Sequence, residues 1–298
     1  LAARLSECTD LESVDLARTY AYEDMAISFT NRCNLRCVYC IQSTQAAHNP
    51  YFTLDFPAQY AAKTLDFFVS TGIRRVRTCV EGEATLYSRW YEVFSSFKDA
   101  HPDIALYMTT NLARRYTDSE IDLLARYQAL DVSCDTLDPV LFAKLRRGGK
   151  LALLLDNINM VQARAKELGI TGPLISLHAV VSDLTWPGIE KLVDYAFAHN
   201  MLPVLGNYEE RANSLAFQKQ ICKPLTTMPR EEQAAAHKLF RRVHDELMRR
   251  GHKHIIGEYL QGGLFHDIAQ NVKQKYNLFD PYDDNPLHNA FLCDPSQG

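Results

Sequence analysis

The sequence has no excess of positive charge and no long apolar run. Lysine and arginine total 32 against 36 aspartates and glutamates, which gives a formal net charge of −4. This balance is unlike that of proteins that bind nucleic acids or anionic membrane surfaces. No stretch approaches the roughly 20 apolar residues that would span a bilayer, and residues 1–20 lack the apolar centre of a signal peptide. These absences predict a cytoplasmic protein with neither a nucleic-acid nor a membrane partner.

Glycine and proline are also scarce, at 13 and 12 of 298 residues, and 47% of the chain is hydrophobic. That composition excludes fibrous and disordered chains. A chain of this length can bury a large core without disulfides or metals as supports.

Six short runs rich in β-forming residues alternate with amphipathic stretches. The runs are 26–30, 74–80, 104–110, 129–134, 174–181 and 201–205. Such alternation indicates βαβ units around a parallel sheet, so the predicted fold class is α/β. We expect residues 1–206 to form this unit and residues 207–298 to form a helical and irregular C-terminal extension.

Within that extension, residues 207–229 are expected to be an irregular loop. Residues 229–251 predict a long helix, and residues 258–276 are expected to contain another.

Three of the eight cysteines lie together, directly after the first predicted strand. Cys33, Cys37 and Cys40 have the spacing C-x3-C-x2-C. Thiolates are the soft ligands that hold zinc or iron–sulfur clusters. Three thiolates from one loop can bind three irons of a 4Fe–4S cluster and leave the fourth iron open to another ligand.

The alternative is a structural zinc site. Such a site needs a fourth ligand, for which His48 or Cys79 is available. Zinc modules usually pair two cysteine knuckles, however, and no second knuckle is present. The spacing therefore favours the iron–sulfur cluster.

The triad, with Tyr39 before its last cysteine, resembles the radical S-adenosylmethionine (radical SAM) enzymes over residues 26–206. The resemblance implies a partial (β/α)6 barrel. In that family, three cysteines hold the cluster and SAM chelates the open iron. Reduction then cleaves SAM to a 5′-deoxyadenosyl radical, which takes a hydrogen atom from the substrate. It also implies that Tyr39 lies at the cofactor and that an electron donor of flavodoxin or ferredoxin type is required.

The segment after the second strand, residues 79–84, resembles the family motif Gly-Gly-Glu-Pro, which receives the SAM ammonium. Gly82 and Glu83 match the motif and are expected to bind SAM. A carboxylate facing an ammonium makes a charge-assisted hydrogen bond. Glu81 replaces the first glycine and Ala84 replaces the proline. We expect Glu81 to reach the substrate as a catalytic residue.

The third and fifth strands add two candidates. Residues 109–111 resemble the family's Thr-Asn-Gly, which assigns Asn111 to the cofactor, and a simple asparagine turn is the alternative. Ser176 and His178 share one face of the fifth strand by its period of two. His178 is either a hydrogen-bonded core residue or a catalytic one facing a ligand.

The fourth strand and the residues after it resemble the Ser-x-Asp and Leu-Arg-Gly stretches of the SPASM and twitch branch. In that branch polar residues contact the SAM ribose and an arginine meets the SAM carboxylate. The resemblance assigns Ser133 and Asp135 to the cofactor, together with Arg146 or Arg147. The alternative for either arginine is a solvated helix face.

Two cysteines of the C-terminal extension, Cys222 and Cys293, leave two mechanisms open. The sequence around Cys293 resembles the opening of an auxiliary-cluster module, but two thiolates cannot fill a four-cysteine site. Either Cys222 and Cys293 join a second iron–sulfur cluster with other ligands, or one of them donates a hydrogen atom to a substrate radical. We assign Cys293 to a metal and Cys222 to catalysis.

These observations predict a radical SAM enzyme acting on a small polar molecule. Only 32 residues precede Cys33, too few for a separate peptide-binding domain, and the C-terminal region is acidic. We therefore expect a sugar or aminocyclitol of antibiotic biosynthesis as substrate, with epimerisation, dehydrogenation or dehydration as outcome. The alternatives are a peptide-modifying enzyme of the SPASM or twitch type and a zinc-stabilised binding module.

Overall fold

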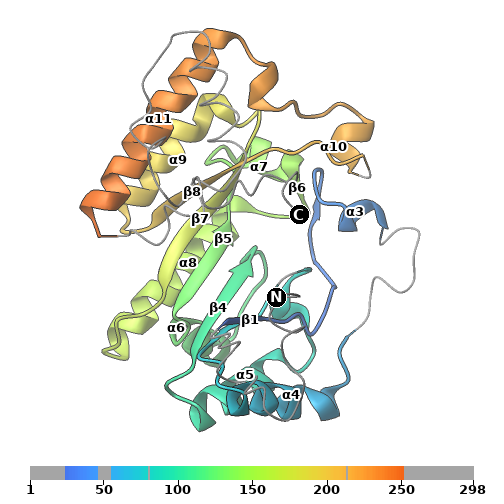
Figure 1. The fold of residues 1–298 in the computed structure, drawn as a ribbon, viewed down its shortest axis with the longest axis vertical. Helices are drawn as coiled ribbons and strands as arrows, with labels where there is room; N and C mark the ends of the chain where they lie inside the picture. The colour runs from blue at the N-terminus through green and yellow to red at the C-terminus, as the bar shows by residue number, and fades with distance from the viewer. Residues whose placement is uncertain (1–23, 46–54, 80, 213, 252–298) are drawn as a thin grey trace, which may run out of the picture.

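The computed structural model describes residues 24–45, 55–79, 81–212 and 214–251. In these residues, six parallel strands form one sheet in the order β1-β3-β4-β5-β7-β8 (Figure 1). The strands are β1 (Asp24–Ala26), β3 (Arg75–Arg77), β4 (Ala105–Thr110), β5 (Ala129–Ser133), β7 (Leu174–Val181) and β8 (Leu202–Asn207). The strand order follows the chain order, so each strand pairs with the one before it. This confirms the predicted α/β fold, a six-stranded partial barrel.

Helices connect the strands and cover the outer face of the sheet (Figure 1). They are α4 (Ala58–Ser70), α5 (Trp90–Ala100), α6 (Asp118–Ala125), α7 (Pro139–Leu145), α8 (Leu151–Glu167) and α9 (Trp186–Ala198). Local signals fix two helix starts. Thr117 and Glu120 form a capping box before α6, and the Asp138 carboxylate accepts two backbone N–H groups at the start of α7.

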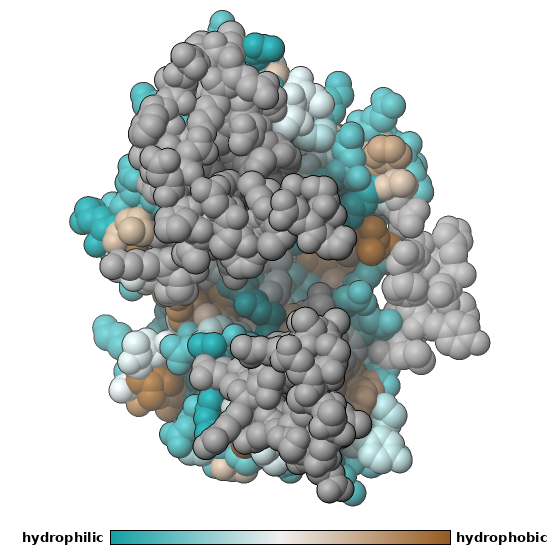
Figure 2. Space-filling view, in the orientation of Figure 1, coloured by the Kyte–Doolittle hydropathy of each residue, from teal (hydrophilic) through white to brown (hydrophobic). Residues whose placement is uncertain are grey.

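Burial alternates along the strands and separates two faces. In β4, Leu106 and Met108 are fully buried beneath the helices, whereas Tyr107 and Thr109 are half-buried on the inner face. Strands covered on only one side show this period of two. In Figure 2 both hydrophilic and hydrophobic side chains are visible, set back near the centre of the view, where the sheet lies in Figure 1.

The first strand differs from the expected run 26–30. Strand β1 ends at Ala26, and the last backbone bond to β3 is that of the Ile27 N–H to the Arg77 carbonyl at 2.8 Å. Phe29 accepts a backbone hydrogen bond from Phe56, and Thr30 forms an isolated bridge with Asp55, whose carboxylate accepts the Thr30 hydroxyl at 2.6 Å. The end of the expected run therefore pairs with residues 55–56 and not with β3.

Residues after β8 pack on the same core as the barrel. Helix α11 (Arg230–Arg249) buries Leu239, Phe240 and Val243 in that core, and Arg242 pairs with Asp194 of α9. The predicted helix 229–251 is thereby confirmed. Two shorter helices, α10 (Leu215–Gln218) and η4 (Leu225–Thr227), lie in the loop before it.

The boundary at residue 206 stays a prediction, and the helix expected in 258–276 lies outside the described residues. No helix in the described part of the chain is long and apolar enough to cross a membrane.

Candidate functional site

Residues 31–40, here called the cysteine loop, follow β1 at the carboxyl end of the sheet. There they contact the segments that follow β3, β4 and β5. The middle of the loop forms a short strand, β2 (Arg36–Cys37), which pairs antiparallel with β6 (Arg146–Arg147) directly after α7. The Val38 N–H donates a further bond, of 2.9 Å, to the Leu145 carbonyl. The C-terminal end of α7 therefore anchors the loop, a pairing that the sequence did not predict.

The three thiols of the loop are partly accessible, and each lies within electrostatic reach of the others. Cys33 is exposed, and Cys37 and Cys40 are half-buried. Desolvation by the surrounding protein raises the pKa of the Cys33 thiol to about 11 and that of Cys37 to about 12. The charge of Glu83 raises the pKa of Cys33 further, whereas at Cys37 the Arg146 cation lowers the pKa and the charge of Asp135 raises it. Without a metal, Cys33 and Cys37 are therefore protonated at neutral pH, and metal binding displaces those protons.

The cysteine loop offers three thiols, at Cys33, Cys37 and Cys40. Among the residues that the structure describes, no three His, Cys, Asp or Glu side chains are grouped to hold a single metal ion. The cysteines of a cubane cluster bind different iron atoms, so they need not surround a single metal ion. The donor set thus fits a 4Fe–4S cluster.

Glu83 brings a buried carboxylate to this site. Its Oε1 accepts the hydroxyls of Thr110 (2.7 Å) and Thr85 (2.8 Å), and its Oε2 accepts the backbone N–H of Asn111 (2.7 Å). All three donors are neutral, and Glu83 has no ion-pair partner among the described residues. Burial raises the pKa of this carboxyl. A buried carboxylate in such surroundings is strongly stabilised by a cation that a ligand brings.

Asn111 connects Glu83 to the cysteine loop. Its backbone N–H binds Glu83, while its side-chain amide donates to Asn34 (2.9 Å) and faces the Cys33 sulfur (3.7 Å). The Asn34 amide in turn donates to the Ala113 carbonyl at 2.9 Å. The loop after β4 thus fixes both the carboxylate and the first cysteine.

Gly82 permits the closest backbone approach in the site. Its φ is +76°, and a Cβ at this position would lie 2.7 Å from the Arg32 carbonyl oxygen and 2.7 Å from the Asn31 carbonyl carbon. The Glu83 N–H donates to the same Arg32 carbonyl at 2.8 Å. Only glycine therefore lets the loop after β3 lie directly on the cysteine loop.

Asp135 and Arg146, both expected at SAM, are paired with each other. Asp135 is fully buried and accepts Arg146 Nε at 2.7 Å and Nη2 at 2.8 Å. It also accepts the Tyr39 hydroxyl and the Val180 N–H (2.9 Å). Four donors satisfy the two oxygens of Asp135, which leaves it no free acceptor for a ribose hydroxyl.

The sequence profile of the radical SAM superfamily matches residues 27–196, more than half of the chain. The chain belongs to the radical SAM superfamily. Enzymes of this superfamily use a 4Fe–4S cluster and SAM, in agreement with the donor set of the cysteine loop.

Two relatives are named GTP 3′,8-cyclase. The probable GTP 3′,8-cyclase of Methanococcus maripaludis is 28% identical over 171 residues, which cover 57% of this chain and 53% of the relative. The GTP 3′,8-cyclase of Listeria monocytogenes is 30% identical over 153 residues, which cover 50% of this chain and 43% of the relative. The chain thus spans about half the length of the curated relatives it matches.

Among solved structures, native anSMEcpe with bound AdoMet and Cp18Cys peptide matches with a TM-score of 0.50 and 15% identity. The match covers 76% of this chain and 61% of that one. At this identity the likeness shows the fold alone, the radical SAM partial barrel.

Three other residues expected at the radical SAM site lie around it. Glu81 is exposed, and its carboxylate accepts the Gln42 amide at 3.4 Å. Ser133 ends β5 on the inner face of the barrel, in register with His178. Arg147 is exposed in β6, opposite Arg36. The structure brings all three to the same end of the barrel, and their roles stay predictions.

The inner face of the barrel carries a polar cluster that the sequence only partly indicated. Asp131 of β5 accepts Arg77 Nη1 at 2.8 Å and the Ser176 hydroxyl at 2.6 Å, and His178 Nε2 lies 3.8 Å from it. We missed Asp131 and Arg77. The available signal was the charge of Asp131 at an inward position of β5, a strand that is otherwise mostly apolar, where a charged side chain is unusual without a partner.

Cys222 lies behind the cysteine loop rather than inside the barrel. It is 3% exposed and packs in a small apolar cluster with Val38, Leu145 and Tyr208. Burial raises the pKa of its thiol to about 11. Cys293 lies outside the described residues. Their roles in a second cluster or in hydrogen donation remain predictions.

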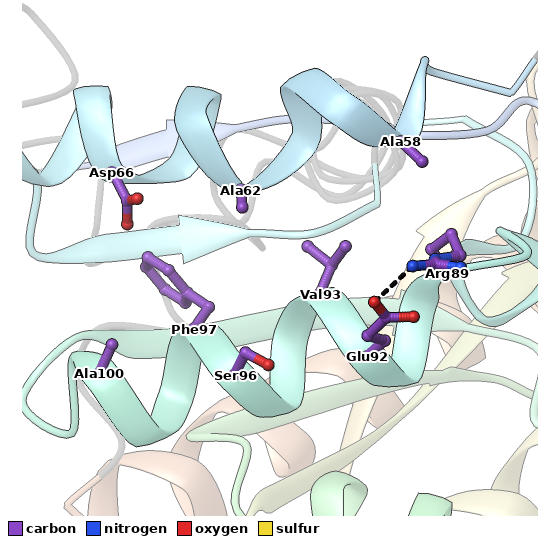
Figure 3. Close-up of a pocket in the computed structure, with 9 residues that line it drawn as sticks. All are labelled: Ala58, Ala62, Asp66, Arg89, Glu92, Val93, Ser96, Phe97 and Ala100. Atoms are coloured by element: carbon purple, nitrogen blue, oxygen red, sulfur yellow. Dashed lines mark hydrogen bonds and ion pairs between the residues drawn. The ribbon is translucent and has the colours of Figure 1, made fainter.

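The groove between α4 and α5 contains none of the predicted site residues. It has a volume of about 270 Å³ and lies on the outer face of the barrel (Figure 3). Ala58, Ala62 and Asp66 of α4 face Val93, Ser96 and Phe97 of α5 across it. The candidate site is therefore the carboxyl end of the sheet and the inner face below it.

Proposed function

We propose that this radical SAM enzyme cleaves SAM reductively and abstracts a hydrogen atom from a small polar substrate held inside the barrel. One observation carries the proposal: the buried Glu83 carboxylate, with neutral partners only, lies beside a loop that offers three thiols. The site combines a place for a cluster with a place for a ligand ammonium.

Each residue has a distinct task in this proposal. Cys33, Cys37 and Cys40 hold three irons. Glu83 receives the SAM ammonium, and Gly82 brings Glu83 to the loop. When bound, the cluster and SAM together supply a 5′-deoxyadenosyl radical for hydrogen abstraction. The protein then orients one C–H bond of the substrate and excludes water.

The proposal is tested by incubating the anaerobically reconstituted full chain with SAM and dithionite and measuring 5′-deoxyadenosine. We expect its formation to depend on iron, SAM and reductant. A chain that carries a 4Fe–4S cluster and binds SAM but never releases 5′-deoxyadenosine would contradict the proposal.

Glu83→Gln is expected to weaken SAM binding by about 2 kcal/mol, the loss of one charge-assisted contact, or roughly 30-fold in Kd. Burial raises the pKa of Glu83, and a bound cation favours its ionised form. SAM affinity of the wild type should therefore increase as pH rises through the raised pKa of Glu83, and Glu83→Gln should remove this dependence. Calorimetric titration across pH measures both effects.

Glu92→Gln, which removes an exposed carboxylate on α5, is the matched control. Its Kd and pH dependence should equal those of the wild type. Equal SAM affinity in wild type and Glu83→Gln at every pH would remove Glu83 from SAM binding.

The polar cluster on the inner face favours a small polar substrate. Arg77, Asp131, Ser176 and His178 offer donors and acceptors, and the paired charges of Arg77 and Asp131 leave no cationic excess there. We propose a sugar or aminocyclitol of antibiotic biosynthesis, with epimerisation, dehydrogenation or dehydration as outcome. Hydroxyl and amine groups match such a cluster better than a polyphosphate does.

A nucleotide is the second candidate, favoured by the names of the two relatives. A peptide substrate of the SPASM or twitch type is the third. The discriminating experiment adds an aminoglycoside, GTP or a cysteine-containing peptide to the SAM-cleavage assay. The true substrate class should raise 5′-deoxyadenosine above the SAM-only background.

His178→Gln is expected to lower substrate-dependent turnover by roughly 10- to 100-fold in kcat/KM, because it removes a hydrogen-bonding group beside Asp131. SAM cleavage without substrate should stay at the wild-type rate. His199→Gln, at an exposed position after α9, is the control. An equal loss in both assays would place His178 at SAM instead of at the substrate.

Further elements of the proposal concern partners. We propose a flavodoxin- or ferredoxin-type electron donor and a cytoplasmic location. A second iron–sulfur cluster that uses Cys222 and Cys293 would bring the iron content to about eight per chain, against about four for the triad alone.

A further inference from the structure

The guanidinium of Arg146 is buried and makes three directed contacts in this structure. The residue is 6% exposed. Nε and Nη2 bind the two oxygens of Asp135, and Nη1 lies 3.9 Å from the sulfur of Cys37, within hydrogen-bonding distance of sulfur. The Tyr39 ring lies beside the guanidinium, with its centroid 5.5 Å from Cζ. The cation thus lies between a carboxylate and a thiol of the cysteine loop.

Four separate segments hold this arrangement. Arg146 belongs to β6, which pairs with the loop strand β2. Asp135 follows β5 and also accepts the Val180 N–H from β7, while Tyr39 donates to it from the loop itself. A bidentate ion pair with this many supports is rigid, so Nη1 stays directed at Cys37.

The family resemblance assigns an arginine to the SAM carboxylate. A bidentate contact of Arg146 with that carboxylate would require Arg146 to leave Asp135 and uncover a buried carboxylate, which is strongly unfavourable. Arg147 is exposed and lies on the neighbouring position of β6. Of the two arginines, Arg147 is therefore the better placed to bind the SAM carboxylate in a bidentate manner.

We infer that Arg146 acts on the cluster through Cys37 and raises its reduction potential. The inference rests on the proposed function, since it requires the triad to hold a 4Fe–4S cluster. The relevant couple takes one electron from an external reductant, [4Fe–4S]2+ + e− → [4Fe–4S]+. A buried cation whose N–H faces a ligating sulfur stabilises the added negative charge. Arg146 is thus a positioning residue that makes the reducing step easier.

The test is a dithionite redox titration of the reconstituted full chain, followed by electron paramagnetic resonance of the reduced cluster. Arg146→Gln should shift the midpoint potential to more negative values. Asp135→Asn should shift it to more positive values, because the cation at Cys37 then loses its counter-charge. General damage to the loop would move both variants in the same direction. Lys144→Gln removes an exposed charge from α7, two residues before Arg146, and should leave the potential unchanged.

Two more variants keep the test decisive if a lone buried charge prevents folding. Arg146→Lys retains the charge, and its potential should lie between those of the wild type and Arg146→Gln. The double variant Arg146→Gln/Asp135→Asn removes both buried charges, and its potential should lie below that of the wild type, because the cation is the nearer group to Cys37.

Each outcome has a separate meaning for the two claims. A wild type that binds no iron contradicts the proposed function. A wild type with a normal cluster, together with variants that share its potential or all shift in one direction, overturns only the inference about Arg146.

Discussion

Replacing Cys37 with alanine is expected to leave the chain without its cluster and to abolish SAM cleavage. Cys37 lies in β2, where pairing with β6 fixes its position beside Arg146. The alanine side chain has no donor atom, and no other cysteine of the loop can move into this place while the pairing holds. Iron per chain after anaerobic reconstitution and 5′-deoxyadenosine release measure the two losses. The same result is expected for Cys33→Ala and Cys40→Ala.

Cys134→Ala is the control for loss of a thiol. Cys134 is fully buried after β5 and donates to the Thr136 carbonyl, outside the cysteine loop. That variant should keep the iron content and the SAM-cleavage activity of the wild type, with a modest loss of stability from the small cavity. Full SAM cleavage by Cys37→Ala would show that the loop does not hold the cluster.

Gly82→Ala is expected to abolish SAM binding and reduce iron loading, although the substitution adds a single methyl group. The new Cβ would lie 2.7 Å from backbone atoms of Asn31 and Arg32, which cannot rotate away. The loops after β1 and β3 would have to separate, which would move Glu83 from the cysteine loop. The positive φ adds about 1 kcal/mol of backbone strain.

Gly169→Ala separates strain from steric overlap. Gly169 has φ +65°, and a Cβ there would meet nothing within 4 Å. Gly169→Ala should lose stability from backbone strain alone, Gly82→Ala should lose more in thermal unfolding because of the steric overlap, and only Gly82→Ala should lose SAM binding. Equal SAM binding in the two variants would contradict the role given to the close approach at Gly82.

Much of the fold follows from local sequence patterns. The strand runs, their helices and α11 are visible because burial has a period of two in strands and 3.6 in helices. The end of β1 was misplaced because Phe29 and Thr30 pair with a segment 25 or more residues away, and such pairing leaves no local periodicity. The β2–β6 pairing was missed for the same reason.

The parts of the site that depend on neighbouring residues of one loop could be predicted from the sequence. The parts that depend on pairs of residues from different strands could not. The cysteine spacing indicates a cluster by itself, because three soft ligands lie on one short loop, and the Gly82-Glu83 pair was predicted from its resemblance to the family motif. The partner of Arg146 is not encoded locally. Whether a guanidinium faces SAM or Asp135 depends on the packing of β5, β6 and β7, which only the structure describes. The ion pair between Asp131 and Arg77 likewise joins two strands that lie far apart in the sequence, so only the structure shows it.

The iron and sulfide content of the anaerobically reconstituted wild-type chain tests the central claim most directly. The account predicts at least one cubane cluster, about four irons with matching sulfide per chain, lost in Cys37→Ala and retained in Cys134→Ala. A chain that binds no iron, or one zinc ion in its place, would contradict the account.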